Sequence, residues 1–291
     1  MTRDPARADD AQFEAFVLRT LQPSIDVLAE YRRVSADSMD PESIHRFRVA
    51  IRRLRADLRS LRPFLDDVRV RDLRSRLAEL DELVRPVRDG DVMMERLATS
   101  AARIPNPVDP EIVEAIHQRL SDNTEIARRR LFEALAEGGQ DTLIALLLAL
   151  PDSGFVHHGV DLVPAMAARN ALLWRRVHKS SKALGRQPDD EHLHRLRVLV
   201  KRSRYLAEAS EPLFGKAASR RAKRAERIQR VLGEHQDSVV LSRALLAMPR
   251  PTTSHAIAID ALLAVESDAR VRLRGKWRKL WRRTGRRDPL L

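Results

Sequence analysis

Apolar residues recur every three or four positions along nearly the whole chain, and the strict alternation of apolar and polar residues that marks strands is missing. A period of 3.6 residues is that of an amphipathic α-helix, so the pattern predicts an all-α protein. The predicted helices cover residues 11–34, 40–63, 68–84, 89–103, 109–137, 141–150, 162–184, 190–211, 216–232 and 254–283.

Acids and prolines indicate where these helices begin and break. Asp40 and Asp109 each stand before a proline, which predicts an N-cap followed by proline at the first helical position. Pro86 predicts an interruption after residue 84, because proline lacks the N–H that a helix interior needs. Asp89 and Asp237 follow predicted breaks, so we interpret them as helix caps rather than catalytic acids.

The helix predicted over residues 40–63 carries two separate stripes. The apolar stripe is suited to a core and consists of Phe47, Ile51, Leu54, Leu58 and Leu61. The other stripe lies roughly 120° away, is cationic and almost unpaired, and consists of His45, Arg48, Arg52, Arg55, Arg59 and Arg62. Like charges one turn apart destabilise a helix, so this stripe suggests a bound anion. The alternative is a solvated face balanced by acids on neighbouring helices.

The same pattern recurs half a chain length later. HRFRVAIRRLRA begins at residue 45 and HRLRVLVKRSRY begins at residue 194. The second copy repeats the cationic stripe with His194, Arg197, Lys201 and Arg204. An internal repeat of this length predicts duplicated architecture. We therefore predict two pseudosymmetric bundles of the four-helix type, whose basic helices face a shared basic channel or cleft.

The repeat also predicts the division of the chain. We expect a flexible N-terminus over residues 1–10, a first bundle over 11–150, a linker over 151–159, a second bundle over 160–283 and a C-terminal tail over 284–291. Residues 11–283 together would form one domain.

Charge and cysteine content narrow the class of partner. A formal net charge of +13 favours a polyanion: nucleic acid, polyphosphate or an acidic membrane surface. The absence of cysteine excludes disulfides and thiolate metal sites. The N-terminal residues contain no apolar signal segment, and the longest apolar run, residues 143–150, is too short to span a membrane. We expect a soluble, cytoplasmic protein.

HRFRVAIRRLR, the RDGDV segment at residues 88–92 and the inexact second copy together resemble the CHAD family, the conserved-histidine α-helical domain. The second copy departs from the family pattern, with KRSR at residues 201–204 and QD at residues 236–237. The resemblance covers residues 11–283 and implies two four-helix bundles that bind inorganic polyphosphate in a basic central channel. Many members also carry a triphosphate-tunnel (CYTH) domain. We find no room and no E-x-E-x-K signature for one, and expect a stand-alone, non-catalytic binding module.

The resemblance also implies which residues contact the phosphate chain. Carried over position by position, they are His45, Arg48, Arg52, Arg55, His194, Arg197, Lys201 and Arg204. Arg53 and Arg202 match the family pattern too, but lie about 100° from the centre of the stripe. They would contact neighbouring acids or a second rim of the channel. Together with Arg59 of the stripe, these residues form the candidate polyphosphate site, and we expect no cofactor and no metal ligand.

Two other functions stay open at the level of sequence. A sequence-independent nucleic-acid binder is disfavoured by an aromatic content of only 4%, because single-stranded nucleic acids stack on aromatic side chains. A metal-dependent phosphohydrolase is disfavoured further, because no paired carboxylate cluster is evident. Association with polyphosphate granules would follow from polyphosphate binding.

Two smaller alternatives concern single elements. His45 and His194 would donate hydrogen bonds to phosphate, more strongly when protonated, or would satisfy backbone groups at the start of their helices. The C-terminal RLRGKWRKLWRR segment would lie on a membrane surface or close the core, and the apolar positions of the matching first-half helix favour the core.

Overall fold

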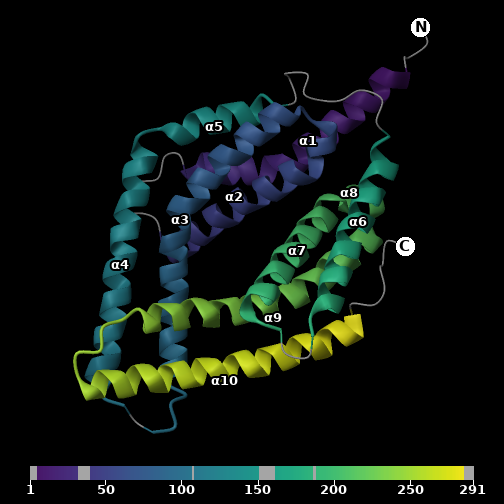
Figure 1. The fold of residues 1–291 in the computed structure, drawn as a ribbon. Helices are drawn as coiled ribbons and strands as arrows, with labels where there is room; N and C mark the ends of the chain where they lie inside the picture. Colours follow the sequence, from purple (N-terminus) through teal and green to yellow (C-terminus); the bar gives the residue numbers. More distant parts are fainter. Residues whose placement is uncertain (1–4, 32–39, 107, 151–160, 186–187, 285–291) are drawn as a thin grey trace.

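The computed structural model describes residues 5–31, 40–106, 108–150, 161–185 and 188–284. These residues are helical almost throughout, which confirms the all-α prediction (Figure 1). The helices are α1 (Pro5–Glu30), α2 (Pro41–Leu61), the short 3₁₀ helix η3 (Arg62–Phe64), α3 (Asp67–Ala101), α4 (Pro110–Ala136), α5 (Gly139–Leu148), α6 (Leu162–Ala183), α7 (Asp190–Ala209), α8 (Glu211–Phe214), α9 (Lys216–Leu246) and α10 (Thr253–Thr284).

The two repeated basic helices begin in the same way. Asp40 caps α2 by accepting a hydrogen bond from the backbone N–H of Ser43 at 2.6 Å. Asp189 caps α7 by accepting one from the backbone N–H of His192 at 2.7 Å. Each cap satisfies an N–H that lacks a partner within the helix, which fixes where the basic stripe starts.

Two predicted helix breaks do not exist. α3 runs without interruption through Pro86, and α9 runs without interruption past Leu232. Asp89 and Asp237 therefore lie inside long helices, and the prediction that they cap helices was wrong. Val84 and Val87, on either side of Pro86, are completely buried. Burial of this seam outweighs the roughly 3 kcal/mol that proline costs a helix interior.

The buried apolar residues form three clusters. The first joins α1, α2, α5 and the first half of α3 with the end of α4, the start of α6 and Leu206 of α7. The second joins α6, α7, the first half of α9 and the end of α10. The third is built from the other ends of the long helices, with α4 and the start of α10, and its members are Leu97, Ile112, Ile116, Leu120, Leu241, Leu245, Ala258, Ile259 and Leu262. α3 lies beside α4, and α9 lies beside α10 (Figure 1). The long helices α3 and α9, like α4, α6, α7 and α10, thus each contribute to two clusters.

The remaining sequence-based boundaries have mixed outcomes. α1 begins at Pro5, so residues 5–10, expected to be flexible, are helical. The expected linker at 151–159 and nearly all of the expected tail lie outside the described residues. The internal duplication remains a prediction.

The end of α10 packs into the core, as the sequence favoured. Trp277 is buried in the second cluster, and the ring of Trp281 lies 6.2 Å from that of Trp174 on α6. Because the apolar face of this basic helix is covered, the membrane-surface interpretation is wrong for it. None of the described helices is both long and apolar enough to cross a membrane.

Candidate anion-binding site between α2, α3, α7 and α9

Four helices meet around a cavity of about 420 Å³ near the middle of the molecule. α2 packs against α3, α7 packs against α9, and contacts between α2 and α7 and between α3 and α9 join the two pairs. The side chains around the cavity are His45, Arg48, Val49, Arg52, Arg85, Arg88, Asp89, Val92, His194, Arg197, Gln236, Asp237 and Val240. Five arginines and two histidines thus surround one space together with only two acids.

The structure brings together five of the predicted site residues, one group from each copy of the repeat. His45, Arg48 and Arg52 come from α2, and His194 and Arg197 come from α7. Their positions follow from the two stripes of α2, because its apolar seam is completely buried against the core and turns the cationic stripe toward α7. Leu196 and Val200, both fully buried, orient α7 in the same way.

The cationic stripe of α2 is less free than its sequence indicates. Arg48 Nη1 donates to Asp89 Oδ1 at 2.8 Å, and Arg48 Nε lies 3.9 Å from Asp81 Oδ1. Arg55 Nη1 donates to Asp81 Oδ2 at 2.8 Å. Arg62 is bonded to Asp67 as well. The description of the stripe as almost unpaired was therefore wrong for three of its members, whose acidic partners all come from α3.

Three predicted site cations have no such partner: Arg52 of α2 and Arg197 of α7, which line the cavity, and Lys201 of α7, which is not among its lining residues. Among the described residues no ion pair is found for Arg52, Arg197 or Lys201. Lys201 is half-buried, and burial, followed by the charges of Arg52 and Arg197, lowers the pKa of its ammonium group to about 6. Lys201 is therefore mostly neutral at pH 7 in the ligand-free protein, although the sequence suggested a charged donor.

Asp237 faces these cations across the cavity. Burial raises the pKa of its carboxyl above the ordinary value, against the opposing effect of Arg197 and Arg96, and the nearby Asp89 raises it further. The two cavity acids are thus close enough to influence each other. An anion that enters here meets one acid already paired with Arg48 and one whose charged form is disfavoured by burial.

The two histidines are held differently. Burial, followed by the charge of Arg88, lowers the pKa of His45, which favours its neutral form. His194 Nδ1 lies 2.8 Å from Gln236 Oε1, which as a carbonyl oxygen only accepts, so Nδ1 carries a proton. In the neutral tautomer its Nε2 is an acceptor and gains a donor proton only on protonation.

Two more predicted site residues, like Arg55, lie against acids and are not among the residues that line the cavity. Arg53 Nη1 is 3.2 Å from Glu208 Oε2, and its guanidinium stacks over Tyr205. Arg204 Nε donates to Glu208 at 2.7 Å and a second nitrogen approaches Glu226. Arg53 therefore contacts an acid, which is one of the two alternatives that the sequence left open for it. Arg204 also contacts acids, although the repeat predicted that it would face the ligand.

A second group of arginines gathers beside the α2–α7 contact and is named here the second basic cluster: Arg59, Arg74, Arg169, Arg176 and Arg202. Arg202 is half-buried, and burial together with Arg59, Arg74 and Arg176 lowers its pKa to about 10. Arg169 Nη2 donates to the backbone oxygen of Arg59 at 3.0 Å. In the described part of the chain, none of the five forms an ion pair with an acid.

Several of these cations are absent from the sequence-derived site. Arg85 and Arg88 line the cavity, and Arg169 and Arg176 come from α6, which carries no copy of the repeat. Arg74 stands within a basic stretch of α3 whose orientation the sequence does not specify. For Arg88 a signal existed, since it opens the RDGDV segment.

The RDGDV segment acts through three neighbouring positions of α3. Asp89 faces the cavity, and Asp91 lies 3.6 Å from Arg128 of α4. Gly90 lies where α3 and α4 touch, and a Cβ added there would stand 2.0 Å from Thr124 Oγ1. Glycine is required by this close approach, which fixes the rotation of α3 and hence the direction of Asp89.

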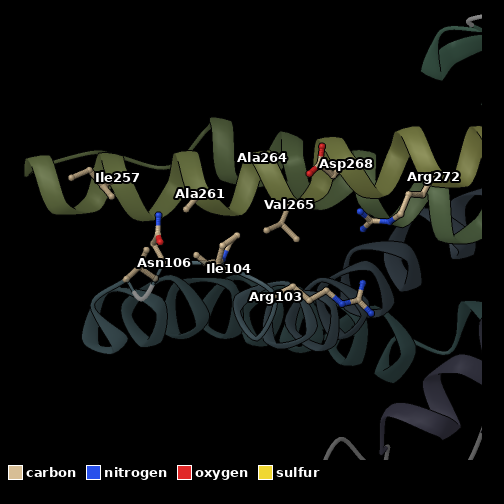
Figure 2. Close-up of a pocket in the computed structure, with 11 residues that line it drawn as sticks. Arg103, Ile104, Asn106, Ile257, Ala261, Ala264, Val265, Asp268 and Arg272 are labelled. Atoms are coloured by element: carbon tan, nitrogen blue, oxygen red, sulfur yellow. The ribbon is translucent and has the colours of Figure 1, made fainter.

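A larger cavity, of about 700 Å³, lies elsewhere and has a different character. Figure 2 shows it between α10 and the chain that follows α3, with Ile104, Ile257 and Val265 along its walls and Arg103 and Arg272 at one end. It is mostly apolar, so it is not the candidate anion site. No group of three or more His, Asp or Glu side chains suited to a metal ion occurs in the described residues.

Comparison with known proteins gives one family and a common fold. A family model described as CHAD domain matches residues 19–246. Among solved structures, PptA from Streptomyces chartreusis superimposes with a TM-score of 0.72 at 18% identity, covering 94% of this chain and 99% of that chain. The CHAD domain from the plant Ricinus communis superimposes with a TM-score of 0.70 at 22% identity, covering 94% and 91%. At these identities the likeness shows the fold.

Two curated relatives come from Mycobacterium tuberculosis. Uncharacterized protein Rv2226 of strain ATCC 25618 / H37Rv is 28% identical over 225 residues, or 74% of this chain and 42% of the relative. Uncharacterized protein MT2285 of strain CDC 1551 / Oshkosh matches with the same figures. The chain thus spans less than half the length of the curated relatives that it matches.

Proposed function

This chain belongs to the CHAD domain family, and we propose that it binds inorganic polyphosphate in the cavity between α2, α3, α7 and α9 without chemical turnover. The observation that carries the proposal is the convergence of five arginines from three helices on one cavity that holds only two acids. Guanidinium groups bind phosphate oxygens through charge-assisted, often bidentate, hydrogen bonds. A polymer with a negative charge on every unit supplies the counter-charge that this cavity lacks.

The residues around the cavity favour polyphosphate over nucleic acid. None of its thirteen lining side chains is Phe, Tyr or Trp. Single-stranded nucleic acids gain about 1–3 kcal/mol for each base stacked on an aromatic ring, and this cavity offers no such surface. The lining suits a ligand that consists of phosphate alone.

The decisive experiment is a competition assay. Long-chain polyphosphate carrying a fluorophore is bound to the purified chain at physiological salt, and duplex DNA, RNA and unlabelled polyphosphate are added at equal phosphate concentration. We expect unlabelled polyphosphate to compete at least about 100-fold better than either nucleic acid, and affinity to fall steeply with added salt. Equal competition by DNA or RNA would move the nucleic-acid function to first place.

A pair of charge-reversal variants locates the binding site. Arg52→Glu combined with Arg197→Glu reverses two cavity cations that have no ion pair, so helicity should persist while polyphosphate binding is abolished. The matched control is Arg46→Glu combined with Arg195→Glu, at exposed positions one residue after each repeated histidine. Because the control has the same net charge, retained binding in the first variant would disprove the assignment.

Two parts of the proposal concern what happens to the bound chain. Incubation of the complex with a divalent ion should release no phosphate, whereas release would indicate a phosphohydrolase. In cells, we expect a fluorescent fusion to be cytoplasmic and to gather at polyphosphate granules.

A further inference from the structure

The 700 Å³ cavity between α10 and residues 103–106, called the α10 trough below, is apolar along most of its length. α3 ends at Ala101, and Pro105, which lacks an N–H, keeps the chain from resuming a helix at once. Figure 2 shows Ile104 of this non-helical stretch opposite Ala261 and Val265 of α10. The trough therefore exists because the chain leaves α3 beside another helix.

The third apolar cluster holds both walls of the trough in place. Ile104 packs against this cluster from one side, and Ile259 and Leu262 of α10 are buried in it from the other. Ile257 of the same helix lines the trough and is 59% exposed. A ligand that covers this apolar surface gains hydrophobic free energy without first having to order the walls.

Positive charge gathers at one end of the trough. Arg103 and Arg272 stand there on opposite walls, as Figure 2 shows. Both are exposed, and no ion pair is found for either in the part of the chain that the structure describes. Asp268, one turn before Arg272, is the only acid among the described lining residues. The charged end thus keeps an excess of positive charge, and the other end, with Ile257 and Asn106, is neutral.

This division of charge selects one kind of ligand. Ligand sites are typically apolar cavities of about 300–1,000 Å³ in which a few polar groups fix the orientation of the ligand. The apolar walls offer few hydrogen-bond partners, so an extended peptide would leave backbone N–H and C=O groups without partners there. A hydrocarbon chain has no such groups, and a carboxylate at its end accepts charge-assisted hydrogen bonds from guanidinium groups.

We propose that the α10 trough binds a free fatty acid, with the acyl chain along Ile104, Ile257 and Val265 and the carboxylate between Arg103 and Arg272. The trough shares none of its lining residues with the cavity between α2, α3, α7 and α9. The inference is therefore independent of polyphosphate binding, and either can fail without the other.

Calorimetric titration with decanoate, decanol and decylamine, all below their micelle-forming concentrations, tests the inference. The three share one chain and differ in the charge of the head group, so decanoate should bind at least about tenfold more tightly than decanol, and decylamine most weakly. Octanoate and laurate vary the chain, and affinity should change about two- to fourfold for each methylene. Equal affinity for decanoate and decylamine, or for octanoate and laurate, would overturn the inference.

Charge variants locate the carboxylate. Arg103→Gln combined with Arg272→Gln should lower decanoate affinity at least about tenfold. The matched control, Arg130→Gln combined with Lys279→Gln, removes the same charge at exposed positions of α4 and α10 and should bind as the wild type does. Asp268→Asn should raise affinity about threefold, because it removes the acid nearest to the head group. Equal losses in the variant and its control would show only a general attraction of anions to a basic protein and would overturn the inference.

A variant that fills the trough tests the position of the acyl chain without changing any charge. Ala261→Trp should abolish decanoate binding while thermal melts show a folded protein, and Ile257→Gln repeats the test if the first variant is unstable. Decanoate that still binds to a folded Ala261→Trp protein would disprove the site.

Two further arms separate the trough from other anion sites. The Arg52→Glu and Arg197→Glu double variant should keep decanoate affinity within about threefold of the wild type, since those cations lie in the other cavity; a complete loss would place the fatty acid there instead. Sedimentation with phosphatidylglycerol vesicles is the second arm. Vesicle binding that depends on Arg103 and Arg272, without binding of free decanoate, would make the trough a membrane contact and overturn the inference.

Discussion

The two sides of the cavity carry matching residues in different electrostatic states. On the α2–α3 side, Arg48 is bonded to Asp89 at 2.8 Å. On the α7–α9 side, Arg197 and Asp237 influence each other without forming an ion pair, and Lys201 loses much of its charge. The α2–α3 side neutralises one of its four cavity arginines before any ligand arrives, whereas the α7–α9 side sets its one cavity arginine opposite an acid that is not bonded to it. A repeated motif thus preserves residue types without preserving their charge state.

Among these predictions, breaking the Arg48–Asp89 ion pair should have the largest effect on polyphosphate affinity. Arg48→Ala removes a cation and leaves an unpaired carboxylate facing the ligand, so we expect polyphosphate affinity to fall by about 30–100-fold. Adding Asp89→Asn should restore affinity to within about fivefold of the wild type. Arg197→Ala should weaken binding about tenfold, with no recovery on adding Asp237→Asn.

These two double-mutant cycles are measured by titration at one salt concentration, with circular dichroism as the check on folding. Equal coupling energies for the Arg48/Asp89 and Arg197/Asp237 pairs would contradict the conclusion that the two sides differ in electrostatic state.

The state of Lys201 predicts a pH dependence of intermediate size. Its pKa is about 6 in the ligand-free protein, and a bound polyanion favours the protonated form, so binding takes up a proton. Affinity should be highest below pH 6 and fall roughly tenfold by pH 8, since one pKa unit corresponds to about 1.4 kcal/mol. His45, whose pKa is also lowered, contributes in the same direction, and Asp237 does so at lower pH.

Calorimetry in buffers of different ionisation enthalpy measures this proton uptake directly. Lys201→Arg keeps the charge at every pH of the experiment, so it should remove most of the dependence, and His45→Gln should remove the smaller remainder. An unchanged pH profile in Lys201→Arg would show that Lys201 does not carry the effect.

The smallest expected effect is on stability, and it is tested by substituting one glycine on the α2–α3 side and one on the α7–α9 side. Gly90→Ala places a methyl group against Thr124, and the forced separation of α3 and α4 should lower stability by about 1–3 kcal/mol. Gly233→Ala, inside α9, has nothing within 4 Å of the new methyl group and should raise stability by about 0.5–1 kcal/mol. Thermal melts should show opposite shifts of a few degrees. Shifts of the same sign would mean that the contact at Gly90 does not restrict α3.

Local features of the fold follow from the sequence, whereas features that depend on distant partners do not. The apolar seam of α2 and the caps at Asp40 and Asp109 are local and were predicted. The break at Pro86 was predicted from proline alone and was wrong, because the burial that keeps α3 intact comes from neighbouring helices. For the same reason the helical wheel of α2 identified Arg48 but not its partner on α3.

Candidate site residues followed the same rule. The repeat identified five residues that line the cavity. Burial of the apolar seam sets the rotation of each basic helix, and this rotation sets the direction of its cationic stripe. It did not identify Arg176, which belongs to a helix outside the repeat, and it assigned Lys201 a charge that its burial removes. Charge state is a property of the assembled cavity.

The third apolar cluster has a consequence for dividing the protein. It joins Leu97 and Ile116 from one half of the chain to Leu241 and Leu262 from the other. Two fragments expressed separately would each leave this surface open and carry only one side of the cavity. Mixed together, they should reassemble through that surface, and recovered polyphosphate affinity would report the reassembly, which makes the chain a natural starting point for a split-protein sensor.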